Sequence, residues 1–403
     1  MTVPVLKLDP VEKKALDEGF ATAFGGAPTH YFSAPGRTEI GGNHTDHQRG
    51  RVLAAAVNLD TVAAVRENGT EYIRVLSEGY PICRVSLKEL LPRQDEINTT
   101  AALVRGVAAR FAQLGCRVSG FDAYCRSSVL PGSGLSSSAA FEVLMGTILN
   151  YLFFDAKATA AEVAQIGQYA ENIFFGKPCG LMDQTASAVG NLVAIDFLDK
   201  DRPVIRPVAF DFSTCGHALC IIDTGADHAD LTQEYAAVPG EMKAVAAYFG
   251  KEVLSQVEES VFLAAIAQLR QACGDRAVLR ALHFYKENAR VWQQVADLEQ
   301  GDFDGFLALV RESGRSSYMY LQNVIPAGSK THQEVALALS LCEHYLQGRG
   351  AYRVHGGGFA GTVQAFVPYD ILEDFRAGIE AVLGSGSCHV LCIRSQGGVR
   401  CQV

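Results

Sequence analysis

The sequence predicts an α+β fold of two domains, because helical and strand-like segments alternate without the regular strand–helix–strand order of a doubly wound sheet. A chain of 403 residues is also long enough for two or three domains of roughly 100–200 residues each. Its hydrophobic fraction of 48% and charged fraction of 20% are typical of a globular protein and exclude long disorder. The charged stretch 199–202, followed by Pro203 and Pro207, is the best candidate boundary, so we expect domains over residues 1–205 and 206–403.

The individual elements follow from capping residues and apolar patterning. Asn98 to Thr100 can cap a helix that continues through Arg110, and residues 137–153 and 159–175 are also predicted to be helical, the second ending at Gly176. Strands rich in Val, Ile and aromatic residues are expected at 52–57, 72–76, 120–125, 192–196, 218–223, 363–367 and 389–393.

The charge and cysteine content favour a cytoplasmic protein that acts on small molecules. Lys and Arg number 35 against 44 Asp and Glu, a net charge of −9, and no basic block suited to nucleic acid is present. No apolar run reaches about 18 residues, and the first residues lack the pattern of a secretion signal. The eleven cysteines form no C-x-x-C pair, which favours reduced, mostly buried thiols.

A glycine- and serine-rich loop is the strongest local signal in the chain. The segment LPGSGLSSSAA at residues 130–140 leads into an apolar helix with Ser136 as a plausible N-cap. The free backbone N–H groups at such a helix start, together with the helix dipole, favour phosphate binding. The segment lacks the lysine of the common P-loop and does not match G-x-S-x-G. A capped helix after a turn explains the segment equally well when it is taken alone.

A polar, glycine-containing segment near the N-terminus is expected to be a loop suited to recognising a polyol, although a solvated turn is the default interpretation when the segment is taken alone. Residues 34–50, APGRTEIGGNHTDHQRG, offer many hydrogen-bonding side chains and lead into the strand at Val52. A hydrolytic metal site at His44, Asp46 and His47 is a weaker alternative. A catalytic zinc usually needs three protein ligands, and no second cluster completes the set.

Two further segments carry candidate functional residues. Asp183 lies between Gly180 and Gly190 in an apolar setting, where a carboxylate is expected to have an ion-pair or hydrogen-bond partner or a functional role. It could also cap a short helix. Glu171 falls near the end of the preceding helix. The glycines at 356–358 precede an alternating strand and permit close backbone approach.

Taken in order, these segments resemble the GHMP kinases and, within that family, the galactokinases. The resemblance rests on Gly36-Arg37 with His44-Thr-Asp46, on GLSSSA at 134–139, on AEN…CGLMDQ at 170–184, on GGGFAG at 356–361 and on SQGG at 395–398. Four positions depart from the family pattern in the first motif, one of them Gly41, which stands where Ile is usual. Glu39 replaces Asn, Asn43 replaces Glu, and His47 replaces Tyr. The phosphate and catalytic motifs are intact, whereas part of the sugar motif is changed.

The resemblance implies an N-terminal domain like ribosomal protein S5 domain 2, a ferredoxin-like C-terminal domain and an ATP-dependent sugar 1-kinase that forms galactose 1-phosphate. Asp183 would face the anomeric hydroxyl as general base or orienting acceptor, and Arg37 would keep it ionised. The implied sugar-binding residues are Asn43, His44, Asp46, Gly180 and Tyr235. The implied ATP-binding residues are Gly132, Ser133, Gly134, Leu135, Ser136, Ser137 and Ser138. Ser138 and Glu171 would bind Mg²⁺.

The expected partners are therefore ATP and a monosaccharide, with no nucleic acid or membrane, in a monomer or weak homodimer. Two alternatives remain open. The substrate could be a galactose-like sugar modified at C6 or C2, such as galacturonate or N-acetylgalactosamine, because Asn43 and His47 alter the sugar motif. The chain could instead be a non-catalytic, galactokinase-like sugar sensor.

Overall fold

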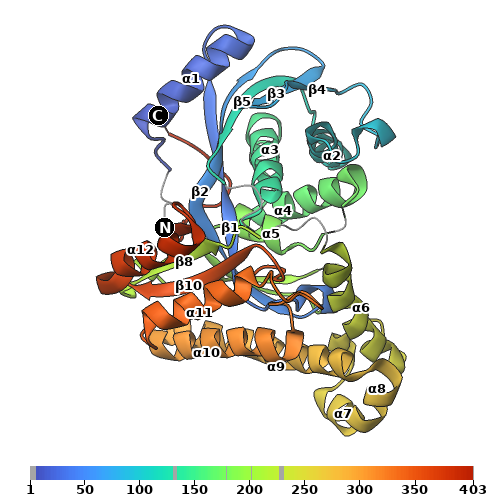
Figure 1. Ribbon diagram of the computed structural model, residues 1–403. Helices are drawn as coiled ribbons and strands as arrows, with labels where there is room; N and C mark the ends of the chain where they lie inside the picture. The colour runs from blue at the N-terminus through green and yellow to red at the C-terminus, as the bar shows by residue number, and fades with distance from the viewer. Residues whose placement is uncertain (1–5, 130–133, 178, 201, 227–230, 403) are drawn as a thin grey trace.

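Two β-sheets with helices packed around them form the protein (Figure 1). The computed structural model describes residues 6–129, 134–177, 179–200, 202–226 and 231–402. In the first sheet the strand order is β12-β1-β2-β5-β3-β4, with β6 paired to β2 and β7 paired to β6. In the second sheet the order is β11-β8-β10-β9. The predicted α+β class is confirmed.

The strands are β1 (His30–Gly41), β2 (Arg51–Glu67), β3 (Tyr72–Ser77), β4 (Cys83–Ser86), β5 (Phe121–Ser127), β6 (Leu192–Asp196), β7 (Val204–Val208), β8 (His217–Asp223), β9 (Ala351–His355), β10 (Thr362–Pro368), β11 (Cys388–Leu391) and β12 (Val399–Arg400). The α-helices are α1 (Pro10–Phe24), α2 (Thr100–Gln113), α3 (Ser137–Phe153), α4 (Ala160–Tyr169), α5 (Met182–Val189), α6 (Thr232–Tyr248), α7 (Glu259–Ala264), α8 (Ile266–Cys273), α9 (Asp275–Gln300), α10 (Phe303–Ser316), α11 (Glu334–Leu346) and α12 (Leu372–Leu383). The short helices are η1 (Asp46–Gln48), η2 (Gln94–Glu96), η3 (Ala170–Phe175), η4 (Phe212–Thr214), η5 (Leu254–Gln256), η6 (Ser317–Leu321) and η7 (Tyr369–Ile371).

Local sequence accounts for several of these boundaries. Thr159 and Glu162 form a reciprocal capping box that starts α4. The next segment, η3, has π-helical hydrogen bonding, a distortion that is frequent at functional sites. The helices predicted at 137–153 and 159–175 are therefore observed, the second as α4 followed by η3.

The loop predicted at residues 34–50 is wrong over its first half. Residues 34–41 belong to β1, which pairs with β2 on one side and with β12 on the other. Both faces of β1 are covered, and from Tyr31 to Gly41 every residue is buried, polar side chains included. A strand buried on both faces lacks the alternation of apolar and polar residues that identifies a half-exposed strand.

The two sheets share one hydrophobic core. It joins residues of β1, β2 and β6 to residues of β8 and β10 through α9 and α10, and includes Ile40, Leu53, Ile221, Val291 and Phe366. Helices α9 and α10 pack against one face of the second sheet, and α11 and α12 pack against the other. This continuous core fixes the second sheet relative to β1.

The division of the strands between sheets bears on the expected domain boundary. β7 pairs with β6 in the first sheet, and β8, the next strand, belongs to the second. The terminal strand β12 returns to pair with β1 at Phe32 and Ser33. The boundary between residues 205 and 206 stays a prediction.

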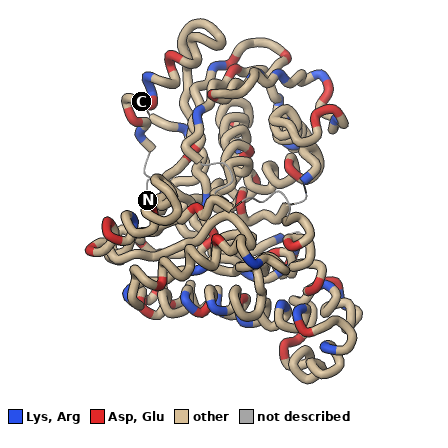
Figure 2. The backbone as a smooth tube through the Cα atoms, viewed as in Figure 1, with Lys and Arg blue, Asp and Glu red and all other residues tan. Residues whose placement is uncertain are grey.

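Charged residues of both signs are interspersed along the chain in both halves of the molecule (Figure 2). Within the described ranges, no helix combines the length and apolar character needed to cross a bilayer.

Candidate active site

Strand β1 carries the first site residues next to two irregularities in its pairing with β2. The register shifts between Pro35 and Arg37 and again between Glu39 and Gly41. Such bulges bend a strand and re-aim its side chains, and they are common beside active sites. The side chains of Arg37 and Glu39 thus project from β1 next to the positions where its pairing with β2 is interrupted.

Arg37 and Asp183 form a bidentate ion pair between β1 and the first turn of α5. Nε of Arg37 donates to Oδ1 of Asp183 at 2.8 Å, and Nη2 donates to Oδ2 at 2.7 Å. Nη1 of Arg37 also donates to the carbonyl oxygen of Gly134, and Oγ of Ser136 donates to Oδ2 of Asp183 at 2.7 Å. Two predicted catalytic residues thereby meet the glycine–serine loop. Asp183 is not the N-cap of α5, because that position is Leu181.

The environment keeps Asp183 ionised. Burial alone would raise the pKa of its carboxyl group, but the charge and hydrogen bonds of Arg37 and the hydroxyl of Ser136 outweigh burial and lower that pKa. The side chain of Asp183 is still 31% exposed, whereas that of Arg37 is only 10% exposed. The carboxylate is therefore accessible to a small molecule while its cationic partner is not.

The glycine–serine loop enters α3 differently from the sequence-based expectation. Ser136 occupies the N-cap position but adopts a left-handed backbone (φ 57°) and makes no capping hydrogen bond, since its hydroxyl is directed to Asp183. The described residues provide no side-chain cap for α3, so its first N–H groups remain available for an anion. Leu135 is buried, and Ser137 and Ser138 are half-buried in the first turn. Gly132 and Ser133 lie outside the described residues.

Asp46, at the start of η1, lies against Gly180. A Cβ atom on Gly180 would lie 2.8 Å from Oδ2 of Asp46, so a larger residue at position 180 would displace this carboxylate. Burial raises the pKa of Asp46, and the negative charges of Glu39 and Asp183 add to that effect, while His44 opposes it. Asp46, Glu39 and Asp183 therefore form one negatively charged region.

His44 and His47 are oriented by a chain of hydrogen bonds. Nε2 of His44 donates to the carbonyl oxygen of Gly357 at 3.0 Å, which leaves Nδ1 to accept from Nε2 of His47 at 3.3 Å. Nδ1 of His47 in turn accepts from Nε2 of Gln48 at 3.1 Å. Burial and the nearby His44 hold the pKa of His47 well below its ordinary value, which favours this neutral arrangement.

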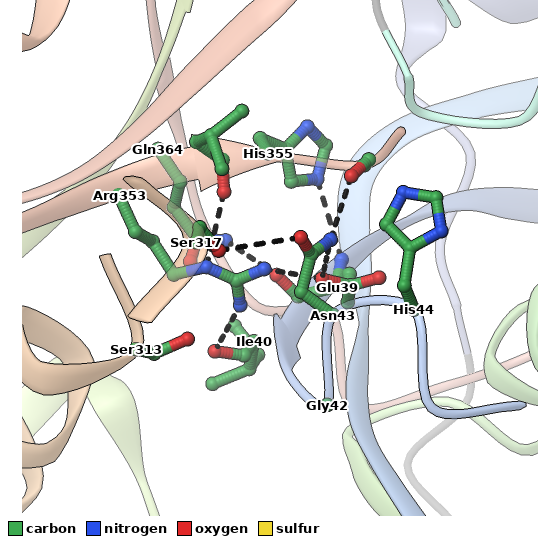
Figure 3. A network of polar contacts seen from close by, with 12 residues as sticks. Glu39, Ile40, Gly42, Asn43, His44, Ser313, Ser317, Arg353, His355 and Gln364 are labelled. Atoms are coloured by element: carbon green, nitrogen blue, oxygen red, sulfur yellow. Dashed lines mark hydrogen bonds and ion pairs between the residues drawn. The ribbon is translucent and has the colours of Figure 1, made fainter. Parts of the chain in front are cut away.

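Asn43 lies at the centre of a buried polar network (Figure 3). Its Nδ2 donates to the carbonyl oxygen of Gly356 at 2.6 Å and to Oε1 of Glu39 at 3.1 Å. Its Oδ1 accepts from Nδ2 of Asn323 at 3.0 Å and from Oγ of Ser317 at 3.4 Å. The residue is 0% exposed. Its expected contact with a sugar stays a prediction, because all of these bonds join it to protein atoms.

The second sheet reaches β1 through two buried side chains of β9. Arg353 pairs with Glu39 and donates to the carbonyl oxygen of Ile40 at 2.9 Å, and Nε2 of His355 lies 3.0 Å from Oγ1 of Thr38. Figure 3 shows Arg353 reaching Glu39 and Ile40, with His355 nearby. These contacts brace the β1 segment that presents Arg37 and Glu39.

Tyr235, on α6, lies beside the glycine turn at 356–358. Its hydroxyl group donates to the carbonyl oxygen of Gly358 at 2.8 Å, and its ring meets that of Phe359 edge-on. His44 bonds to the same turn at Gly357. The structure thus brings two predicted sugar-binding residues to one turn.

Glu171 belongs to a buried cluster of carboxylates behind the start of α3. Nε2 of Gln184 donates to Oε2 of Glu171 and to Oε2 of Glu142, each at 2.9 Å. Burial and the charge of Glu171 raise the pKa of Glu142 well above its ordinary value. Ser138 lies one helical turn before Glu142 on α3. In the described ranges no three His, Cys, Asp or Glu side chains gather into a metal-holding group. The oxygen donors Ser138 and Glu171 do fit Mg²⁺, which commonly takes one or two protein carboxylates together with phosphates and water.

Comparison with known proteins identifies the family. Residues 18–67 match the galactokinase galactose-binding signature, and residues 102–191 match the N-terminal domain of GHMP kinases. The structure is similar to that of Lactococcus lactis galactokinase complexed with galactose, with a TM-score of 0.80, 25% identity, and coverage of 96% of this chain and 99% of that one. The chain belongs to the GHMP kinase family. It is a galactokinase-like kinase, as its motifs predicted.

More distant kinases share the fold. A D-glycero-D-manno-heptose 1-phosphate kinase from Bacteroides thetaiotaomicron has a TM-score of 0.63 at 15% identity, covering 93% of this chain and 99% of that one. Streptococcus pneumoniae phosphomevalonate kinase has a TM-score of 0.62 at 13% identity, covering 92% and 100%.

Sequence reasoning missed several residues of the site. Arg353 and His355 are two positions apart on one strand and so point to the same face, a signal that the sequence does contain. Gln184 directly follows Asp183, and Glu142 follows Ser138 by one turn. No sequence pattern predicts the contact of Ser136 with Asp183, because the contact depends on the left-handed backbone of Ser136.

Proposed function

We propose that this kinase transfers the γ-phosphoryl group of ATP to the anomeric hydroxyl of galactose, giving galactose 1-phosphate and ADP. The observation that carries the proposal is the partly exposed Asp183 carboxylate, paired with buried Arg37 at the edge of the glycine–serine loop. Asp46 and Gly180 lie at the same site, and residues 18–67 match a galactose-binding signature.

The hydrogen bonds of Asp183 define its part in the reaction. Its two carboxylate oxygens offer about four acceptor positions, and Arg37 and Ser136 occupy three, which leaves one on Oδ1 for a substrate hydroxyl. The lowered pKa makes Asp183 an orienting acceptor more than a strong base. This suits phosphoryl transfer, because its loose transition state requires little proton removal before the new bond forms. The sugar oxygen bonds to the γ-phosphorus, the bond to the ADP oxygen breaks, and Oδ1 of Asp183 accepts the hydroxyl proton.

The start of α3 would hold the phosphates of ATP. Its first N–H groups have no side-chain cap among the described residues, Ser137 and Ser138 are half-buried in its first turn, and the preceding Ser136 bonds to Asp183. Ser138 and Glu171 would bind Mg²⁺, which supplies charge neutralisation on the phosphates when it is present. Arg37 adds a fixed positive charge beside the reacting group.

The charges around the site favour a neutral polyol. Glu39, Asp46 and Asp183 influence one another, while Arg37 and Arg353 are already paired with carboxylates. A carboxylate on the substrate would meet this negative region with no unpaired cation from either arginine, which disfavours galacturonate. Asn43 would contribute by fixing the loop that presents His44 and Asp46.

An ADP-release assay with galactose, glucose, galacturonate, N-acetylgalactosamine and arabinose tests the proposal, with ³¹P NMR to locate the phosphate on the product. We expect the highest kcat/KM with galactose, phosphorylation at C1 and no turnover of galacturonate. A higher kcat/KM for N-acetylgalactosamine would assign a C2-modified substrate instead. Sugar and ATP binding without turnover would overturn the kinase activity and indicate a sensor.

A further inference from the structure

Gln184 holds two carboxylates from different elements with one amide group. Its Nε2 donates at 2.9 Å to Oε2 of Glu142 on α3 and at 2.9 Å to Oε2 of Glu171 on η3. Gln184 and Glu142 are 0% exposed, and Glu171 is 3% exposed. Gln184 directly follows Asp183 on α5, so the same short helix carries the substrate-facing carboxylate and this amide.

The packing around the amide is tight. A Cβ atom on Gly167 of α4 would lie 3.2 Å from Cγ of Gln184 and 3.2 Å from Oε2 of Glu142. Within the described part of the chain, Oε1 of Glu142 and Oε1 of Gln184 are buried with no hydrogen-bond partner. Buried polar atoms without partners are costly, so their retention at this place calls for a reason.

The alternative orientation of Glu171 is also visible. Its Oε1 lies 3.6 Å from Nζ of Lys177, whose side chain is 63% exposed. Without the bond from Gln184, Glu171 would keep this contact and a hydrogen bond with the thiol of Cys179. The Lys177 contact would draw the carboxylate toward solvent. The amide of Gln184 has two hydrogens, and Glu142 accepts the one that does not go to Glu171, while Sγ of Cys179 lies 3.6 Å from the same nitrogen. The bond to Glu142 therefore helps to hold the amide in the orientation that faces Glu171.

We propose that Glu142, acting through Gln184, is a positioning residue that holds Glu171 in the orientation required for a divalent cation at the phosphate loop. The inference rests on the proposed function, in which Ser138 and Glu171 bind that cation. Residues that orient a metal ligand by hydrogen bonding commonly change metal affinity by about 10–100-fold when they are replaced.

Two replacements of Glu142 separate positioning from packing. Glu142→Met keeps the length of the side chain but removes the acceptor, whereas Glu142→Gln keeps an acceptor oxygen for Nε2 of Gln184. Thr147→Val is the matched control, because Thr147 is buried on the same helix and, among the described residues, its hydroxyl group bonds only to the carbonyl oxygen of Val143. If Glu142→Met does not fold, Glu142→Asp takes its place, because its carboxylate is one methylene too short to reach Nε2 of Gln184.

The readout is the affinity of the enzyme–ADP complex for Mn²⁺, measured by electron paramagnetic resonance without any phosphoryl transfer. We expect Glu142→Met, or Glu142→Asp in its place, to weaken Mn²⁺ binding at least about tenfold. Glu142→Gln and Thr147→Val should stay within about twofold of the wild type. Unchanged affinity in a folded Glu142→Met variant, with only a lower Tm, would overturn the inference.

Glu171→Gln separates this inference from the proposed function. Weaker Mn²⁺ binding in that variant supports the assignment on which the inference rests, and unchanged binding overturns both the assignment and the inference. If the wild type binds Mn²⁺ with ADP as expected but phosphorylates no sugar, the proposed function fails and the positioning role of Glu142 stands.

Discussion

Asn43 donates a hydrogen bond of 3.1 Å to Oε1 of Glu39, and Arg353 pairs with the same carboxylate oxygen from the second sheet. Glu39 and Asn43 are the two positions at which the galactokinase pattern has Asn and Glu in the opposite order. The carboxylate and the amide have therefore exchanged places along the chain while remaining in contact. Arg353, fully buried, reaches the carboxylate from β9.

Asn43→Glu alone is expected to be strongly destabilising. It would face the carboxylate of Glu39 and the carbonyl oxygen of Gly356 with a second negative group, at a position that is 0% exposed. A buried, uncompensated charge costs about 3–5 kcal/mol. The double variant Glu39→Asn/Asn43→Glu restores one amide and one carboxylate within reach of Arg353. It should recover at least about 1 kcal/mol relative to the sum of the single changes. Urea unfolding of all four proteins measures this coupling, and additive effects would refute it.

Asp183→Asn tests the catalytic carboxylate. We expect kcat to fall by at least about 10², because the amide cannot present a charged acceptor to the substrate hydroxyl and its NH₂ group would face the donors of Arg37 and Ser136. The dissociation constant for ADP should change little, since phosphate binding is assigned to the start of α3. Calorimetry with ADP and steady-state kinetics give the two values. A kcat within threefold of the wild type would remove Asp183 from the chemistry.

Removing the hydroxyl group of Ser136 should shift the acid limb of the rate profile. The bond from Ser136 helps to lower the pKa of Asp183, so its loss raises that pKa. Activity requires ionised Asp183, and the acid limb of kcat/KM therefore moves to higher pH while the rate at pH 8 changes little. Ser136→Ala and Ser136→Gly should show the same shift. The glycine variant should be more stable than the alanine variant by about 1–2 kcal/mol, because residue 136 has a left-handed backbone with a φ of 57°. An unmoved acid limb in both variants would contradict the role of this bond.

The sequence predicts best those structural features that are set by residues close together along the chain. The bounds of α3 follow from its apolar run and the serines before it, and the Arg37–Asp183 pairing follows from the resemblance. The strand at residues 34–41 could not be recognised, since its polar Thr38 and Glu39 are buried against partners from distant elements, among them His355 and Arg353 of β9. The Glu142–Gln184–Glu171 cluster depends on three elements meeting, which no local pattern specifies.

His283, on α9, bonds to the backbone of Asn43 in the segment that leads into η1, and this buried contact gives a pH-dependent prediction. It is 0% exposed; Nε2 donates to the carbonyl oxygen of Asn43, and Nδ1 accepts from Oγ of Ser316, each at 2.9 Å. Burial lowers its pKa to about 4, with Glu287 opposing that shift and His44 and Arg290 adding to it.

The sign of the effect follows from proton binding. As the pH falls below the ordinary histidine value of about 6.5, the unfolded chain takes up a proton at this residue, while the folded protein does not until about pH 4. The contribution of His283 to stability is therefore complete above pH 6.5 and is lost on acidification, at up to about 1.4 kcal/mol per pH unit. His283→Gln keeps one donor and one acceptor but cannot titrate. Its free energy of unfolding, measured in urea between pH 7.5 and 4.5, should fall less steeply than that of the wild type. Parallel curves for the two proteins would show that the pKa of His283 is the same in the folded and unfolded states, which would contradict the prediction.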